Sequence, residues 1–246
     1  MKKLLYRTVS AKTFVFLFFA LIAVCALVFG GGAIAQKTSA EAQKRDPPVI
    51  VIDAGHGGED GGASSSSGII EKDINLSISM KVKSLLDTIG FKTVSVRSDD
   101  RLIYDSSCKT MREKKVCDIH KRLDIMNSYP GCIFLSIHQN HFSQSKYTGA
   151  QVFYSKNTPE SALLAECIQN SFAQNLQKEN TRKIKPSGTE IYLLYHAKET
   201  AVMVECGFLS NGGEAELLND GDYQTKTALA IVSGLMQYLS NSRAGV

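Results

Sequence analysis

The 246-residue sequence predicts a single α/β domain, with a mostly parallel central sheet flanked by helices. Two observations carry this prediction. Short apolar runs typical of strands buried on both faces alternate with segments whose apolar residues recur at helical spacing. Strands that alternate with helices favour a parallel sheet, because each helix returns the chain to the end of the sheet where the previous strand began. Apolar residues make up 43% of the chain and charged residues 21%, which is a globular composition.

The N-terminal segment has the pattern of an export signal. Basic residues up to Lys12 precede an apolar run over residues 13–30, and residues 33–35 (AIA) have the small-x-small pattern of a cleavage site. The run is also close to the ~18–20 residues that span a bilayer. Residues 1–35 are therefore either a signal peptide or an N-terminal membrane anchor. Basic residues before the run keep the N-terminus inside, so we expect an exported domain, secreted or held on the outer face of the membrane.

The predicted domain begins after a short linker. Residues 36–47 are polar and aperiodic, and we expect them to lead into a domain over residues 48–241. PVIVID at residues 48–53 is a continuous apolar run typical of a buried strand. A loop rich in Gly and Ser follows, and then a helix whose apolar residues recur from Ile74 to Ile89. KTVSVR at residues 92–97 is the second predicted strand.

The second half of the chain continues the alternation. Residues 98–117 are polar and charged, and we expect an exposed insertion there, followed by a short helix over residues 118–128. Thr158 and Glu160 open a further predicted helix, and another with apolar residues from Leu229 to Leu239 closes the domain. Apolar runs predict four more strands, over residues 132–138, 150–155, 191–196 and 201–206.

The charge of the domain excludes one class of function. The chain has 28 basic and 24 acidic side chains, but four basic ones lie before residue 13. After residue 35 the balance is therefore 24 against 24 (28 − 4 = 24). A nucleic-acid binder needs a basic surface to displace counterions, so we expect no nucleic-acid partner.

The six cysteines do not suggest a metal site, because no two have the CxxC spacing. Cys132, Cys167 and Cys206 fall in apolar segments, where we expect buried thiols. Cys108 and Cys117 flank a short polar loop. In an exported protein they either pair or stay free, and the spacing leaves both readings open.

Three predicted strands end in residues suited to catalysis. PVIVID runs into His56, CIFLSI into His138 and AVMV into Glu205. In open α/β sheets, ligands bind in the crevice beyond the carboxyl ends of the strands. If these strands lie parallel and close together, their three side chains converge there. Glu71 begins the first helix, and the Gly-rich stretch 57–68 allows the preceding loop to fold back over the strand ends.

Two histidines and one carboxylate are a common ligand set for catalytic zinc. His56, Glu71 and His138 are the candidate ligands, and Glu205 is the candidate proton shuttle. Spacing alone leaves the metal open, since a strand-end histidine is often only an exposed polar residue and Glu71 suits a helix N-terminus. Glu205 is the least expected on structural grounds, because a carboxylate in an apolar run is costly unless it is paired or used.

At these residues the sequence resembles the N-acetylmuramoyl-L-alanine amidase family called Amidase_3. The similarity covers about residues 48–240, with the motifs in family order. The four matching segments are VIDAGHGGEDGGA, IIEKDINLSI, FLSIHQNHF and VMVECGFLSN. The resemblance implies a single α/β catalytic domain around a Zn²⁺ ion, with His56, Glu71 and His138 as ligands and Glu205 as the catalytic carboxylate.

The implied activity is hydrolysis of the amide between N-acetylmuramic acid and L-alanine in peptidoglycan. Residues 181–211 further resemble the germination-specific members of this family, which implies removal of stem peptides from spore cortex before muramic-δ-lactam forms. A general amidase of the vegetative wall is the alternative. The sequence departs from the usual family pattern at Gln139-Asn140-His141 and in the loop 98–117.

Several alternatives stay open at this stage. A zinc carboxypeptidase would use the same site chemistry, whereas a non-catalytic wall-binding domain would be expected to lack a ligand or the base. Arg122 and Arg182 are candidates for contacts with substrate carboxylates, because arginine forks suit them; for Arg122 we favour an ordinary surface charge. The sequence leaves open whether an activating partner protein completes the zinc site.

Overall fold

The computed structural model describes residues 47–244. The predicted signal or anchor over residues 1–35 lies outside the described residues, as does the predicted linker except for Pro47. These boundaries stay predictions. In the part of the chain that the structure describes, no helix has the length and apolar character needed to cross a bilayer.

The described residues form a six-stranded sheet in the order β2-β1-β3-β6-β4-β5. The sheet is mostly parallel, as predicted, whereas the order of the strands was not predicted from the sequence. β1 lies parallel to β2 and β3, and β3 lies parallel to β6. β4 runs antiparallel to β6 and parallel to the short edge strand β5. The strands span Ile50–Ala54 (β1), Thr93–Ser95 (β2), Ile133–Asn140 (β3), Gln151–Tyr154 (β4), Lys185–Pro186 (β5) and Thr200–Phe208 (β6).

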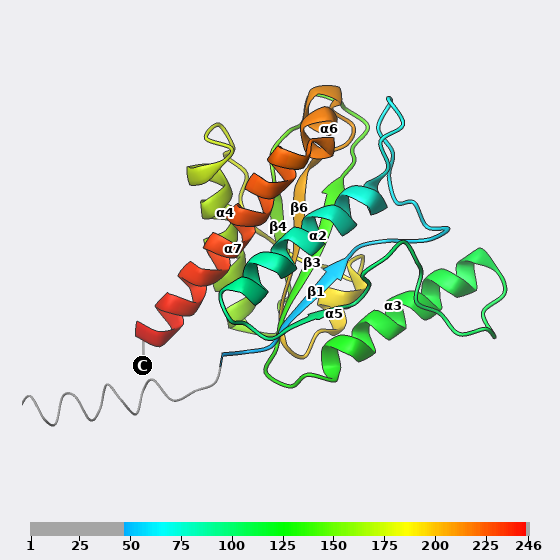
Figure 1. Ribbon diagram of the computed structural model, residues 1–246, viewed down its shortest axis with the longest axis horizontal. Helices are drawn as coiled ribbons and strands as arrows, with labels where there is room; N and C mark the ends of the chain where they lie inside the picture. Colours follow the sequence, from blue (N-terminus) through cyan, green and yellow to red (C-terminus); the bar gives the residue numbers. More distant parts are fainter. Residues whose placement is uncertain (1–46, 245–246) are drawn as a thin grey trace, which may run out of the picture. The chain divides into compact units, whose positions relative to one another are not determined.

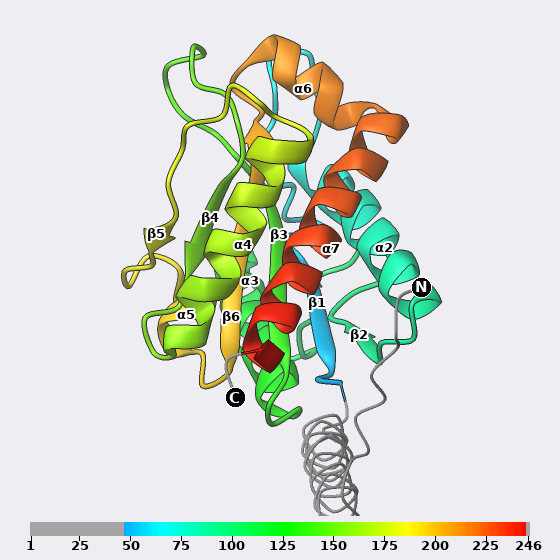
Figure 2. The ribbon, with the colours of Figure 1, turned by 90° about the vertical axis from the view of Figure 1, so that its left-hand side faces the viewer.

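Helices cover both faces of the sheet (Figures 1 and 2). Within β1, Ile50 and Ile52 pack on the face covered by α2, α4 and α7, whereas Val51 packs with residues of α3 and α5 on the other face. This alternation follows from the two-residue period of a strand. The helices span Glu71–Thr88 (α2), Met111–Asn127 (α3), Pro159–Asn175 (α4), Tyr192–His196 (α5), Gly212–Asn219 (α6) and Gly221–Ala244 (α7).

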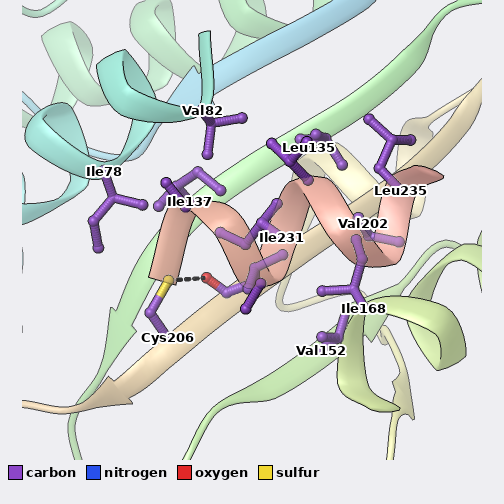
Figure 3. Packing of buried hydrophobic residues seen from close by; sticks show 14 of the residues in the cluster. Ile78, Val82, Leu135, Ile137, Val152, Ile168, Val202, Cys206, Ile231 and Leu235 are labelled. Carbon is purple, nitrogen blue, oxygen red and sulfur yellow. Dashed lines mark hydrogen bonds between the residues drawn. The ribbon is translucent and has the colours of Figure 1, made fainter. Parts of the chain in front are cut away.

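The larger core lies under α7. Ile231 and Leu235 of α7 pack against Leu135 of β3 and Val202 of β6, with α2 and α4 on either side (Figure 3). All four of these side chains are fully buried. Close packing under α2, α4 and α7 fixes the strands, and the carboxyl ends of the parallel strands lie together at one edge of the sheet, where ligands bind in open α/β sheets.

Two predicted elements are wrong. Residues 191–196 were expected to form a strand, but Tyr192–His196 is the short helix α5. Its apolar run is buried on the α3 side, where Leu193 and Leu194 join the smaller core, and a short apolar run does not distinguish a strand from a buried helix. Helix α3 begins seven residues earlier than predicted, at Met111, because Thr110 and Glu113 form a capping box within the supposed insertion. Helix α6 was not predicted.

The structure joins Cys108 to Cys117 in a disulfide, which answers the question left open by their spacing. The bond ties the loop before α3 to the second turn of that helix. Cys132 and Cys206 are buried free thiols as expected, while Cys167 is only partly buried.

Candidate metal centre

The first histidine is presented by a strained turn after β1. His56 has φ +61°, a left-handed conformation that is uncommon for a residue with a side chain. Two buried arginines hold this turn. Arg97 donates from Nε to the Ala54 carbonyl at 2.8 Å, and Arg122 donates from Nη2 to the His56 carbonyl at 2.8 Å. Such strain persists only where surrounding contacts over-determine the backbone, and these arginines supply them.

Glu71 reaches the site because the Gly-rich loop folds back over the strand ends, as predicted. The Glu71 backbone N–H donates to the Ala63 carbonyl at 2.9 Å, and the Ala63 N–H donates to Glu71 Oε2 at 2.9 Å. The N–H of Gln139 on β3 donates to Glu71 Oε1 at 3.1 Å. Glu71 is therefore a buried carboxylate fixed from two elements rather than a solvated helix terminus.

The structure brings His56, Glu71 and His138 together. One nitrogen or carboxylate oxygen from each lies within 4.8 Å of the others. Glu71 Oε2 is 3.3 Å from His56 Nε2, and Glu71 Oε1 is 3.0 Å from His138 Nδ1. The opposite nitrogen of His56, Nδ1, lies 2.8 Å from Asp60 Oδ2. A carboxylate on the far nitrogen of an imidazole is the usual way in which a metal-binding histidine is oriented.

The electrostatics of this cluster favour a cation. Burial opposes a charge on His56, but hydrogen bonds to Asp60 and Glu71 outweigh burial and raise the pKa of His56 to about 9. Burial would likewise raise the pKa of Glu71, yet the imidazoles of His138 and His56 hold it well below its usual value. The negative charge that retains a proton on His56 would equally stabilise a metal ion between the three groups.

Glu205 lies beside the cluster without joining it. It is the register partner of His138 across β3 and β6, so both side chains emerge on the same face of the sheet. Its Oε2 atom is buried and has no hydrogen-bond partner among the described residues. Burial raises the pKa of Glu205 to about 7; the charges of His138 and His56 oppose this rise, and the charge of Glu71 adds to it. An unpartnered carboxyl group with such a pKa is suited to accept and release a proton near neutral pH.

A cleft of about 490 Å³ opens on this centre and is lined by His56 and His138. One of its walls is formed by Ile191, Tyr192 and Leu193, the segment that was mistaken for a strand. His141, three residues after His138, is exposed and lies outside the cluster. Asp60 was not among the predicted site residues; its spacing of four residues after His56 is the signal that could have identified it.

Arg122 is not the surface charge that we favoured. Its side chain is 2% exposed and pairs with Asp53 and Asp118, which leaves no fork for a substrate. The burial of Arg122 could not be predicted because Asp53 is distant in the sequence, and Asp118, one helical turn away, would equally suit an exposed ion pair. Its role is to position the backbone that carries His56.

Gly62 provides a test of how tightly this centre is built. A methyl group there would lie 2.5 Å from Glu71 Oε2 and 2.7 Å from His56 Cδ2, at a φ of +70°. Gly68→Ala is the matched control, since Gly68 has φ +86° and open space around it. We expect both variants to lose about 1–2 kcal/mol of unfolding free energy from backbone strain, and only Gly62→Ala to lose metal affinity as well, by about tenfold or more. Equal metal affinities in calorimetric titrations of the two variants would contradict this geometry.

Comparison with known proteins agrees with the geometry. The model of the Amidase_3 family, described as N-acetylmuramoyl-L-alanine amidase, matches residues 50–237. The chain belongs to this family. The resemblance predicted from the four motifs is confirmed, and the match includes all four candidate site residues. The enzyme is an N-acetylmuramoyl-L-alanine amidase, a hydrolase whose substrate is peptidoglycan and whose action is therefore extracytoplasmic.

Three relatives illustrate the similarity. The germination-specific N-acetylmuramoyl-L-alanine amidase of Bacillus subtilis (strain 168) is 33% identical over 172 residues, which is 70% of this chain and 72% of the relative. The CwlD amidase from Clostridioides difficile, solved in complex with the GerS lipoprotein, is 42% identical with a TM-score of 0.76, over 79% of this chain and 99% of that one. The catalytic domain of the amidase CwlV from Bacillus (Paenibacillus) polymyxa is 29% identical with a TM-score of 0.66, and the match covers 79% of this chain and 99% of that one.

Proposed function

We propose that this amidase is zinc-dependent and that it removes stem peptides from spore-cortex peptidoglycan, the step before muramic-δ-lactam formation. The observation that carries the metal assignment is the convergence of His56, Glu71 and His138, with Asp60 on the far nitrogen of His56. Two histidines and a carboxylate are a common catalytic zinc set and leave a coordination position open. When bound, the ion supplies Lewis acidity, which favours deprotonation of water at neutral pH and polarises an amide carbonyl.

In this mechanism Glu205 moves the proton. Its carboxylate accepts a proton from the water that attacks the lactyl carbonyl carbon. The C–N bond to L-alanine then breaks, and Glu205 returns the proton to the leaving nitrogen. The water oxygen stays on the lactyl group as a carboxylate, so the products are a glycan strand and a stem peptide with a free amino terminus. The raised pKa of Glu205 supports both directions of transfer.

The cortex role rests on similarity to the germination-specific amidase of Bacillus subtilis. We propose further that the enzyme is exported, either secreted or anchored by residues 1–35. A relative in complex with a lipoprotein supports the proposal that a partner protein assists this enzyme too. The vegetative wall remains the alternative substrate, distinguished by deleting the gene in its host and measuring muramic-δ-lactam in the spores. Normal lactam content would contradict the cortex role.

Removal of the metal tests the chemistry. We expect the zinc-loaded enzyme to lose its activity with a chelator and to regain it when zinc is added back. Mass spectrometry of digested muropeptides should show intact stem peptides that begin with L-alanine. Release of C-terminal amino acids instead would identify a carboxypeptidase, and full activity after chelation would contradict zinc dependence. Stoichiometric, tightly held zinc in the isolated chain would argue against dependence on a partner.

A further inference from the structure

A second hollow lies beyond Glu205, on the same face of the sheet as the metal cleft. It measures about 340 Å³ and is lined by residues at the edge of the sheet formed by β4 and β5. Four aromatic rings and two cations shape it, and no acidic residue lines it. We call this depression the edge hollow; its aromatic and cationic lining residues are Phe142, Tyr147, Phe153, Phe208, Arg182 and Lys185.

Strand register connects the edge hollow to the catalytic centre. His138, Glu205 and Gln151 occupy one row across β3, β6 and β4, and Gln151 lines the hollow. Arg182 extends this row, since its Nη1 donates to Gln151 Oε1 at 3.3 Å. Paired residues on neighbouring strands point to the same face, so the row runs from a candidate metal ligand through the base to a cation.

A second row runs parallel to the first. Met203 of β6 is paired with Phe153 of β4, and Phe153 with Lys185 of β5. Met203 lines the metal cleft, whereas its two neighbours line the edge hollow. The two depressions are therefore adjacent along one sheet face, with Glu205 between them.

The cations of the edge hollow are positioned but not neutralised. Arg182 lies over the Phe208 ring at 4.4 Å, and its Nε donates to the Thr148 carbonyl at 2.8 Å. Among the described residues, neither Arg182 nor Lys185 forms an ion pair. Burial raises the pKa of Glu214, and the charge of Arg182 opposes this rise. The Glu214 carboxylate already accepts hydrogen bonds from the backbone N–H groups of Phe208 and Gly149.

We propose that the edge hollow binds the stem peptide on the leaving side of the cleaved amide, with Arg182 and Lys185 holding its carboxylates. This inference rests on the proposed function. Of the two arms of the substrate, the glycan strand is uncharged around the cleaved bond, whereas the stem peptide carries several carboxylates. Only the peptide arm therefore complements a hollow with two unpaired cations, and arginine suits planar carboxylates in particular.

The spacing fits this occupant. Neighbouring strands lie about 4.8 Å apart, so β5 is roughly 10 Å from β6 across the sheet. An extended peptide covers about 10 Å in three residues. With L-alanine beside Glu205, the carboxylates of the second and third stem residues would reach Arg182 and Lys185.

The test compares cation-free variants on charged and uncharged peptides. We expect Arg182→Gln/Lys185→Gln to lose about 10–100-fold in kcat/KM on a muropeptide with free stem carboxylates, since charge-assisted hydrogen bonds are lost. On the same muropeptide with its stem carboxylates amidated, the variant and the wild type should be equal. Lys183→Gln is the control, because its side chain is exposed on the same segment and does not line the hollow.

Each outcome separates this inference from the proposed function. A wild-type enzyme that cleaves neither muropeptide contradicts the proposed function itself. An active wild type with an unaffected double variant, or with the same loss on the amidated substrate, overturns only the edge-hollow assignment. If the double variant does not fold, Lys185→Gln alone, which changes an exposed residue, should still show the charge-dependent loss. Direct binding of the free tripeptide, measured by calorimetry and weakened in this variant, gives a readout without turnover.

Discussion

Glu205→Gln is expected to lower kcat/KM on muropeptides by about 10³-fold while leaving the zinc content unchanged. The substitution keeps the size of the side chain and removes its ability to take a proton from water. The metal should remain because Glu205 lies outside the cluster formed by His56, Glu71 and His138. Stability should not fall, since the lost group is a carboxyl whose Oε2 is buried without a partner. Kinetics on purified muropeptides and elemental analysis of the same preparation check both parts.

Glu71→Gln gives the contrasting pattern. Its carboxylate faces both histidines, at 3.3 Å from His56 Nε2 and 3.0 Å from His138 Nδ1, so the variant should lose zinc and activity together.

Two outcomes would contradict the role of Glu205. Activity of Glu205→Gln within tenfold of the wild type would show that Glu205 does not transfer the proton. A Glu205→Gln enzyme without zinc would make Glu205 a ligand instead of the base.

Much of this candidate site could be predicted from the residues that follow the apolar runs. His56, His138 and Glu205 follow apolar runs, and parallel strands bring the ends of such runs to one edge of a sheet. β1, β3 and β6 are neighbours in the sheet, so the expected convergence is confirmed. The order of the strands was not predictable from the runs themselves. Glu71 could be placed because a Gly-rich loop before it gives the chain freedom to return.

The parts that could not be predicted depend on contacts between distant residues. In the sequence, Asp60 cannot be distinguished from other polar loop residues; only the folded structure shows its Oδ2 at 2.8 Å from His56 Nδ1. The run at 191–196 is apolar enough for a strand, and only packing against the smaller core makes it α5. Lys185 could not be identified as a candidate binding residue from the sequence, because its place beside Phe153 depends on the pairing of β4 with β5. No local pattern specifies the register of two such short strands.

Arg122→Met should cost about 3–5 kcal/mol of unfolding free energy at pH 7. Methionine fills part of the volume, but Asp53 and Asp118 lose the buried cation that pairs with both. The carbonyls of Ala54 and His56 also lose a donor, so the strained turn at φ +61° is less well held and zinc affinity should fall. Urea unfolding at several pH values measures the first effect. Arg101→Met, at an exposed arginine, is the matched control and should stay within about 0.5 kcal/mol of the wild type.

The pH dependence separates a lost ion pair from lost packing. Burial raises the pKa of Asp53, but in the wild type the charge of Arg122, together with the charge of His138 and the hydrogen bonds from Ser136 and Arg122, outweighs burial and holds the pKa below its usual value. A lowered folded-state pKa means that wild-type stability from Asp53 is present above about pH 4, its unfolded value, and is lost below it. In Arg122→Met, burial acts unopposed by this cation, so the folded variant takes up a proton more readily than the unfolded chain. The destabilisation should therefore shrink as the pH falls from 7 to 4; a penalty that stays constant over this range would show that packing, and not the buried charge, explains the effect.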